Sequence, residues 1–378
     1  MDCRGEFADF EGVAYLNAAG QGPLPLAAAR AAQAALEWKK LPHQIPEGVY
    51  FDLPDRVREK VARLIGAEQD EIAITTGASG GLAAVAAGID WKQGDEVLVS
   101  RGEFPAHFST WASYARAGKL RLGTVIPRNR FLSAEDYVEH IGPETRLVSA
   151  SLVRFDDGSL LDAARLAQAC HAAGALVLLD VTQYAGARPL AIRELGVDFA
   201  VCGGYKWLLS PYGTGFFWVA REQAQNLKLG PVYWQALEGA RDFHALGLAD
   251  AQVAAGARRW DSPETANFTN LSAMEASLDF ILRVGIDEIG RHNETLVNEI
   301  IRCLPRDRCA LRSPSEPGCR GPYVCVSARQ KNGTKALFEQ LRDAHVVVSL
   351  RENSLRIAPH IYNTLDDVAR LARILAVV

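Results

Sequence analysis

A chain of 378 residues with 48% hydrophobic content is long enough to bury a sizeable core, as one large domain or as a large and a small one. Its formal net charge of −4 leaves no basic surface of the kind that binds nucleic acid or an anionic membrane. No apolar run is long enough to span a membrane. The seven cysteines are an odd number scattered over a long chain, so we expect free thiols and a cytoplasmic location. Their spacing is unlike that of a tetrahedral zinc site, so we expect no metal.

The first predicted elements are a short extended piece and two helices. Residues 13–16 (VAYL) are extended, and the glycine turn 17–23 (NAAGQGP) follows, which a simple strand-to-helix loop also explains. The alanine-rich stretch 26–39 predicts one helix. Apolar residues at helical spacing predict a second helix over 53–65, ended by Gly66.

Residues 72–82 (IAITTGASGGL) predict a strand, a glycine-rich turn and the start of a helix that continues to about residue 87. The amino terminus of a helix presents free N–H groups and partial positive charge, which suits a phosphate. The backbone amides of Ala78 and Ser79, with the Ser79 hydroxyl, are therefore candidate phosphate ligands. The alternative is that Ser79 is a plain N-capping serine.

Strand and helix patterns then alternate along the chain. Apolar runs predict further strands at 96–100, 122–126, 147–153 and 175–180. A helix is predicted between the last two strands, at 161–173. A run that is apolar at every position is typical of a parallel strand covered on both faces. We therefore predict an α/β protein with a mostly parallel sheet, and Asp180 ends one of its strands.

A lysine follows the next strand, within residues 199–219 (FAVCGGYKWLLSPYGTGFFWV). A desolvated amine loses part of its proton affinity, and the neutral amine is the form that condenses with an aldehyde. Asp180 and Lys206 should lie at the same edge of one sheet, since both follow parallel strands. Together they are the anion and the amine that a pyridoxal phosphate site needs. The alternative for Lys206 is a strand-end side chain that extends to water.

Beyond residue 230 the pattern changes. A helix is expected at 271–284 and strands at 323–327, 346–349 and 354–357, which is typical of a smaller α+β domain. We therefore expect a large domain at 16–250 and a small α+β domain built from 1–15 and 251–378.

The order of these motifs resembles the class V aminotransferase family of fold-type I pyridoxal phosphate enzymes, which includes cysteine desulfurases, kynureninase and isopenicillin N epimerase-like proteins. The motifs are DVTQ at 180–183, YKW at 205–207, RRWDSPETANF at 258–268 and LRIAPHIYNT at 355–364. The resemblance extends from Tyr15 to Thr364. It implies a fold-type I transferase in which a large domain holds a mostly parallel seven-stranded sheet and a smaller α+β domain follows.

The resemblance also implies contacts with the cofactor, pyridoxal 5′-phosphate. Lys206 carries it as a Schiff base and then acts as general base, and Asp180 faces the pyridine nitrogen. The remaining contacts are to the phosphate, the ring face and the ring hydroxyl: Ala78, Ser79 and Tyr205 for the phosphate, Phe104 for the ring face and Gln183 for the hydroxyl.

Substrate and partner contacts follow from the same resemblance. Arg356 is expected to clamp the substrate α-carboxylate, with a structural salt bridge as the alternative. Asn17 is expected near the substrate, and His107 either faces the substrate or caps a helix. Thr265 is expected to reach the phosphate of a partner subunit, which implies a homodimer with shared active sites, or to lie in a surface loop.

Several positions depart from the family pattern. Gly203 and Tyr205 stand where relatives bind phosphate through serine and histidine, and Glu264 replaces a glycine. Phe155 stands where desulfurases carry an asparagine, and a phenyl ring cannot make that hydrogen bond. Residues 348–354 contain no cysteine that could attack a substrate sulfur, which disfavours persulfide chemistry.

Transamination of an α-amino acid is the first choice of reaction, because it needs no residue beyond Lys206. β-Elimination, for example C–S lysis of a cysteine derivative, is the second choice, and epimerisation is the third. A non-catalytic scaffold of this fold would usually lose the lysine or the aspartate. A dinucleotide-dependent enzyme would need a G-x-G-x-x-G motif, which residues 77–81 lack.

Overall fold

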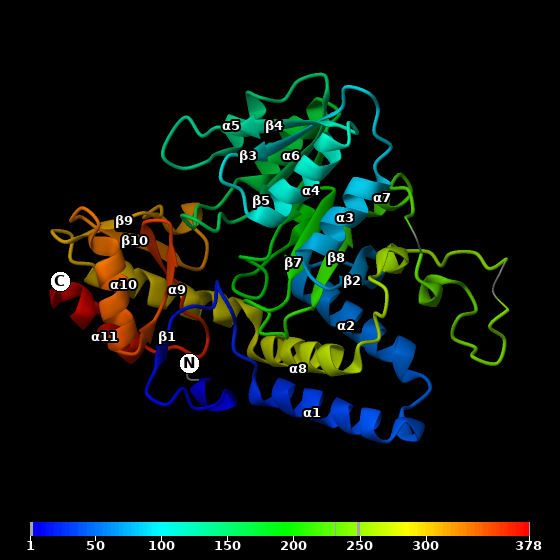
Figure 1. Cartoon of the computed structure of the whole chain (residues 1–378), viewed down its shortest axis with the longest axis horizontal. Helices are drawn as coiled ribbons and strands as arrows, with labels where there is room; N and C mark the ends of the chain where they lie inside the picture. Colours follow the sequence, from blue (N-terminus) through cyan, green and yellow to red (C-terminus); the bar gives the residue numbers. More distant parts are fainter. Residues whose placement is uncertain (1–2, 231, 248–249, 378) are drawn as a thin grey trace.

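The computed structural model describes residues 3–230, 232–247 and 250–377 and contains a larger and a smaller helix-flanked sheet (Figure 1). The smaller sheet lies beside the larger one and is formed mainly by the carboxyl-terminal part of the chain. The expected domain ranges stay a prediction, and positions 1, 2, 231, 248, 249 and 378 within them lie outside the described residues.

The larger sheet has seven strands in the order β2-β8-β7-β6-β5-β3-β4. Strand β8 is antiparallel to both of its neighbours, and the other neighbouring strands are parallel. The strands are β2 (Ile72–Thr75), β3 (Glu96–Ser100), β4 (Arg121–Val125), β5 (Thr145–Ser151), β6 (Leu176–Asp180), β7 (Phe199–Gly203) and β8 (Gly215–Val219). The predicted fold class, an α/β protein with a mostly parallel seven-stranded sheet, is confirmed.

Helices cover both faces of this sheet. The helices of this unit are α1 (Leu26–Lys40), α2 (Val49–Ile65), α3 (Ala78–Gly88), α4 (Pro105–Arg116), α5 (Ala134–Val138), α6 (Ala163–Ala172), α7 (Arg221–Ala224) and α8 (Phe268–Val284), of which α1 packs mainly on α8. Helix α8 follows residue 250 in sequence but packs against α1 and α2, so it connects the two units.

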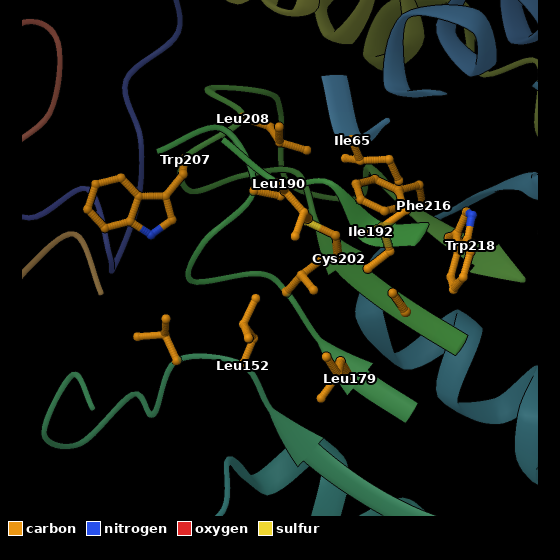
Figure 2. Close-up of a cluster of buried hydrophobic side chains, with 14 of the residues drawn as sticks. Ile65, Leu152, Leu179, Leu190, Ile192, Cys202, Trp207, Leu208, Phe216 and Trp218 are labelled. Atoms are coloured by element: carbon orange, nitrogen blue, oxygen red, sulfur yellow. The ribbon is translucent and has the colours of Figure 1, made fainter. Parts of the chain in front are cut away.

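Alternate side chains of the central strands enter two hydrophobic clusters. Leu178 packs with residues of α3 and α4, whereas Val177 and Leu179 pack with residues of α2 and α6. Figure 2 shows part of the second cluster, in which Leu179 and Cys202 lie on neighbouring strands. Because both faces are buried, a ligand can reach these strands only at their ends.

The smaller sheet is antiparallel, in the order β12-β13-β10-β9. Its strands and helices are β9 (Cys309–Leu311), β10 (Val324–Ala328), β12 (Ser349–Arg351), β13 (Ser354–Ile357), α9 (Ile286–Cys303), α10 (Gly333–Asp343) and α11 (Leu365–Val377). Strand β1 (Ala14–Tyr15) pairs in parallel with β11 (Val346–Val347), so the first residues of the chain join this unit.

The predicted strands of the large sheet begin within two residues of the observed ones. Helices α4, α5, α7, α9, α10 and α11 were not predicted. In the described part of the chain, no helix combines the length and the apolar character that crossing a membrane requires.

Candidate active site

The carboxyl ends of β6 and β7 meet at one edge of the large sheet. Asp180 ends β6 and pairs in register with Val201 of β7, and Lys206 follows shortly after that strand. A cavity of about 320 Å³ opens at this edge. The expected cofactor residues that line it are Ala78, Ser79, Phe104, Asp180, Gln183, Tyr205 and Lys206. The fold therefore gathers these residues from four separate segments around one lysine.

Lys206 is buried, and its amine has no polar partner. The side chain is 7% exposed, and its Nζ makes no hydrogen bond or ion pair with any residue that the structure describes. The Nζ atom lies 5.3 Å from the centre of the Phe104 ring and 5.4 Å from that of Tyr205. Burial lowers the pKa of Lys206 to about 8, although the charge of Asp180 opposes this shift. A substantial fraction of this amine is therefore neutral near pH 8 and able to condense with an aldehyde.

Asp180 is a buried carboxylate that is held on both oxygens. Its Oδ1 accepts a hydrogen bond from the Thr182 backbone N–H at 2.8 Å, and its Oδ2 lies 3.4 Å from Nε2 of His107. Burial acts to raise the pKa of Asp180, but the contacts with His107 and Thr182 outweigh it and leave the pKa lowered. Asp180 is therefore an anion at neutral pH, as a partner for a protonated pyridine nitrogen must be.

The expected substrate contact of His107 is wrong. Its side chain is fully buried and does not line the cavity, because it lies behind Asp180. Its Nδ1 is 2.9 Å from Oγ of Ser149, and this contact leaves Nε2 directed at the carboxylate. Burial acts to lower the pKa of His107, but Asp180 raises it overall. The role that this position allows is to orient Asp180 and keep it ionised.

The first turn of α3 forms another wall of the cavity. Gly77 precedes the helix with φ 148° and ψ 179°, and no side chain caps this end. The interpretation of Ser79 as an N-capping serine is therefore wrong. The backbone N–H groups of Ala78 and Ser79 have no partners within the helix, and both residues line the cavity, so an anion can accept from them. The ring of Tyr205 also lines it, 4.7 Å from the ring of Tyr212.

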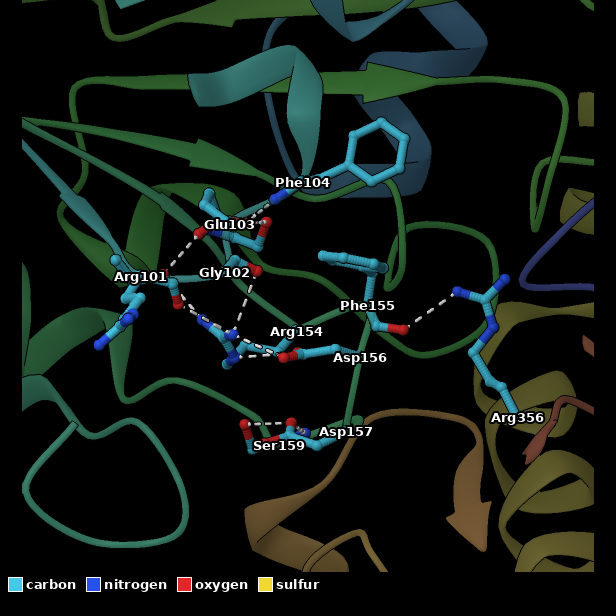
Figure 3. A network of polar contacts seen from close by, with 12 residues as sticks. Arg101, Gly102, Glu103, Phe104, Arg154, Phe155, Asp156, Asp157, Ser159 and Arg356 are labelled. Carbon is cyan, nitrogen blue, oxygen red and sulfur yellow. Dashed lines mark hydrogen bonds and ion pairs between the residues drawn. The ribbon is translucent and has the colours of Figure 1, made fainter. Parts of the chain in front are cut away.

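Phe104 is held beside Lys206 by the carboxylate of the preceding residue. Glu103 is 7% exposed, and its Oε1 accepts hydrogen bonds from the Phe104 backbone N–H at 2.9 Å and from Ser151 Oγ at 2.6 Å (Figure 3). The Phe104 ring meets the ring of Phe155 edge-on, with centres 5.3 Å apart. These contacts fix the aromatic wall before any ligand binds.

The amino-terminal glycine turn supports the opposite side of the site. Gly22 passes so close to the Lys206 loop that a Cβ atom there would lie 2.0 Å from the Lys206 carbonyl oxygen. Gln183 accepts a hydrogen bond from Trp207 Nε1 at 2.9 Å and donates one to the Ala19 carbonyl at 3.2 Å. The Gln183 amide is thus oriented by the protein, and the residue lines the cavity.

Arg356 lies at the junction of the two units. It is 2% exposed, its Nη1 donates to the Phe155 carbonyl at 3.1 Å, and its buried Nε has no partner among the described residues (Figure 3). Asn17 is close by, since its Oδ1 accepts from the hydroxyl of Ser349, the residue paired with Arg356 across the hairpin. Neither Arg356 nor Asn17 lines the cavity around Lys206 itself.

Thr265 lies apart from the other expected cofactor residues. It is 6% exposed, donates its hydroxyl to the Ser262 carbonyl and does not line the cavity of its own chain. The preceding Glu264 has φ 57°, in the left-handed region that favours glycine. The backbone therefore keeps a glycine-like conformation at the position where the family carries glycine.

Further residues that the sequence analysis did not single out also line the cavity, among them Ser151, Val153, Thr182 and Tyr212. Ser151 ends β5 and Thr182 follows β6, so the rule that ligands bind at the carboxyl ends of strands was a usable signal for both. Glu103 had no sequence signal, and the sequence analysis named His107 without its partners Ser149 and Asp180, which lie on other strands.

The fold and this site define a fold-type I pyridoxal phosphate enzyme. The chain superposes on the solved structure of a C-DES mutant with glycine covalently linked to the PLP cofactor, with a TM-score of 0.89, 22% identity and 99% of each chain covered. A family model described as aminotransferase class-V matches residues 49–371, and the chain belongs to that family. Pyridoxal 5′-phosphate is the cofactor of this family, and the expected cofactor and resemblance are confirmed.

Two named relatives show how far the similarity extends. The chain is 29% identical over 311 residues to an uncharacterized aminotransferase, YcbU, of Bacillus subtilis, and the aligned region covers 82% of this chain and 80% of the relative. It is 30% identical over 301 residues to a probable cysteine desulfurase of Methanothermobacter thermautotrophicus, covering 76% of this chain and 71% of the relative. These relatives carry names for different reactions, so membership of the family does not select one.

Proposed function

We propose that this protein is a pyridoxal phosphate-dependent enzyme that transaminates an α-amino acid at Lys206. The observation that carries the proposal is a buried amine with a pKa of about 8, in a cavity that also contains the buried carboxylate Asp180. A buried lysine without an ion pair destabilises a fold, so its presence at a cavity points to chemistry rather than to structure.

The residues present fit the cofactor. The first turn of α3, with Ala78 and Ser79, offers N–H groups to the phosphate, and the Tyr205 hydroxyl adds a donor that relatives obtain from histidine. Phe104 offers a ring face for stacking, and Asp180 offers the anion for the pyridine nitrogen. When bound, pyridoxal phosphate supplies an aldehyde that condenses with amines and a protonated ring that withdraws electrons from the substrate α-carbon.

Lys206 moves the proton. Its Nζ is the only amine that lines the cavity among the described residues, and a pKa of about 8 would let it accept the α-proton of a substrate near neutral pH. The same Nζ would carry that proton on, and release of the keto acid would still need hydrolysis by water before the first half of a transamination is complete. Asp180 stays ionised throughout, because the contacts with His107 and Thr182 keep its pKa low.

Arg356 orients the substrate. A carboxylate accepts two parallel hydrogen bonds from a guanidinium, and the partnerless Nε of Arg356 is a donor available for such a pair. Because Arg356 is 2% exposed, this contact would be little screened by water. The rigid guanidinium thus holds the α-carbon in one position relative to Lys206.

The alternative reactions differ in what else they need. β-Elimination needs an acid that protonates the leaving group, and the tyrosine hydroxyls of Tyr205 and Tyr212 at the cavity are the described candidates, which makes a β-eliminating C–S lyase the second choice. Epimerisation needs a proton delivered to the opposite face of the α-carbon, and it comes third. Persulfide formation needs a thiolate at the site, whereas no cysteine among the described residues lines the cavity, and burial raises the pKa of the fully buried Cys202 and Cys325.

We also propose that the enzyme works as a homodimer in which Thr265 completes the phosphate site of the partner. The support is that Thr265 lies outside the cavity of its own chain although the motif around it resembles the family's phosphate loop. Mixing two inactive variants, Lys206→Ala and Thr265→Val, should restore part of the activity, since one site of each heterodimer would be intact. No recovery, or a monomeric mass in solution, would contradict shared sites.

The reaction is tested by following the absorbance of the cofactor. The holoenzyme is incubated with single amino acids, and pyruvate, ammonia and sulfide are measured in parallel. Conversion to a pyridoxamine-type spectrum that a keto acid reverses supports transamination. Release of pyruvate with sulfide or ammonia, while the original spectrum returns unaided, would make the enzyme a lyase instead.

A further inference from the structure

A second cavity adjoins the first at Phe155. It has a volume of about 300 Å³, and Phe155 is the described residue that lines both cavities. The Phe155 ring meets Phe104 beside Lys206, while its carbonyl accepts the hydrogen bond from Arg356 (Figure 3). A substrate held by its α-carboxylate at Arg356 therefore has this second cavity next to it.

Three arginines without carboxylate partners line the second cavity. Each is anchored by one hydrogen bond to an uncharged acceptor: Arg130 Nη2 to the Leu311 carbonyl at 2.7 Å, Arg312 Nε to Ser327 Oγ at 2.6 Å, and Arg351 Nη1 to the Leu350 carbonyl at 3.1 Å. No ion pair joins any of them to a described carboxylate. A guanidinium has five N–H donors, so each arginine keeps several for a ligand.

Two of the three acidic residues in this cavity are already engaged. Asp156 pairs with the buried Arg154 at 2.7 Å, and Asp157 accepts hydrogen bonds from the Ser159 backbone and hydroxyl at 2.8 and 2.7 Å. Glu352 is exposed at the rim. With Arg154 counted, four arginines face three carboxylates around this cavity, so a net formal charge of +1 remains there.

The hairpin of β12 and β13 relates this charge to the expected substrate clamp. Arg356 pairs in register with Ser349, and Arg351 lies two residues further along the strand of Ser349. Side chains two residues apart share a face of a strand, and opposite residues of an antiparallel pair point to the same side. Arg351 and Arg356 therefore lie on one face of the hairpin, about 7 Å apart along it, since each residue of a strand adds about 3.3 Å. The charge of Arg351 also reaches the catalytic cavity, where it contributes to the lowered pKa of Lys206.

We propose that the second cavity is a subsite for an anionic group at the end of the substrate side chain. The substrate class is then an α-amino acid with a second acidic group, a distal carboxylate or a phosphate, a few bonds from the α-carbon. Its methylene groups would pack on Phe155, and its distal group would be bound by Arg351, Arg312 and Arg130. This inference rests on the proposed function, because it takes the α-carboxylate to be held by Arg356.

The test compares matched acidic and neutral amino acids on the holoenzyme. Binding is measured from the change in cofactor absorbance with L-glutamate against L-glutamine, L-2-aminoadipate against L-norleucine, and O-phospho-L-serine against L-serine. The wild-type protein should bind the acidic member of at least one pair roughly tenfold or more tightly. The glutamate, aminoadipate and phosphoserine arms separate carboxylates of two lengths from a phosphate.

Variants assign the preference to the cavity. Arg351→Gln with Arg312→Gln should weaken binding of the acidic ligand roughly tenfold and leave its neutral match within about threefold, and added salt should narrow the wild-type preference. The matched control is Arg342→Gln, because Arg342 is an exposed arginine on α10 paired with Asp343 and does not line this cavity. This control variant should leave the binding of both the acidic and the neutral ligand unchanged.

The outcomes separate the two proposals. A spectral response to neutral amino acids without any acidic preference, or an equal loss for both ligands in the double variant, overturns the subsite and leaves the Lys206 chemistry standing. No response to any amino acid overturns the proposed function and the subsite with it.

Discussion

Replacing Lys206 with methionine should stabilise the apoenzyme at neutral pH, although it removes the chemistry. Burial lowers the pKa of Lys206 from 10.5 to about 8, and each pKa unit corresponds to about 1.36 kcal/mol. Keeping this amine charged in the folded state therefore destabilises the apoenzyme by roughly 3 kcal/mol at pH 7. Because the folded-state pKa is lowered, the destabilisation is complete below about pH 8 and disappears as the pH rises to 10.5.

The measurement is urea unfolding of cofactor-free wild type and Lys206→Met at several pH values between 7 and 10. The variant should be more stable at pH 7, and most of its advantage should be lost by pH 10. Lys228→Met is the control, since Lys228 is an exposed lysine paired with Asp90, and it should change the free energy of unfolding by less than about 0.5 kcal/mol. A variant less stable than wild type at pH 7, or an advantage that does not vary with pH, would refute the account of a desolvated amine.

Three further predictions address the groups around this amine. His107→Leu should raise the pKa of Asp180, because the imidazole no longer opposes the effect of burial. The variant should therefore bind the cofactor roughly tenfold more weakly in an absorbance titration. The control is His171→Leu, which removes a second histidine–aspartate contact away from the site and should leave cofactor binding unchanged. Glu264→Gly should raise the free energy of unfolding by about 0.5 kcal/mol, because glycine adopts the left-handed backbone conformation without strain, and this gain outweighs the added freedom of the unfolded chain. A loss of stability would show that contacts of the glutamate side chain stabilise the fold by more than this strain costs. Arg356→Lys should weaken the spectral response to amino acids at least tenfold and leave the response to simple amines unchanged, and an equal effect on both would exclude a carboxylate clamp.

The cofactor cavity was largely predictable because it depends on the ends of strands. The runs before Asp180 and Lys206 are apolar at every position, which marks buried parallel strands, and such strands end at the same edge of a sheet. The glycine turn before Ala78 marked the amino terminus of a helix in the same way. Local sequence patterns of this kind predict where in the fold a residue lies.

The errors arose where a side chain is defined by a distant partner. His107 follows the strand β3 and was expected to face the substrate or to cap a helix, but the neighbouring strands β5 and β6 supply Ser149 and Asp180, and the imidazole lies between them. Nothing near His107 in the sequence specifies those partners. The second cavity was not predicted for the same reason, since Arg130, Arg312 and Arg351 come from three segments that lie together only in the folded chain.

The central claim is that Lys206 carries the cofactor, and chemical trapping tests it most directly. The purified holoenzyme is reduced with borohydride, digested and analysed by mass spectrometry for a phosphopyridoxyl group. The account predicts the modification on the peptide that contains Lys206, and its absence from a Lys206→Ala variant. A phosphopyridoxyl group on another lysine, or none on protein reconstituted with pyridoxal phosphate, would contradict it.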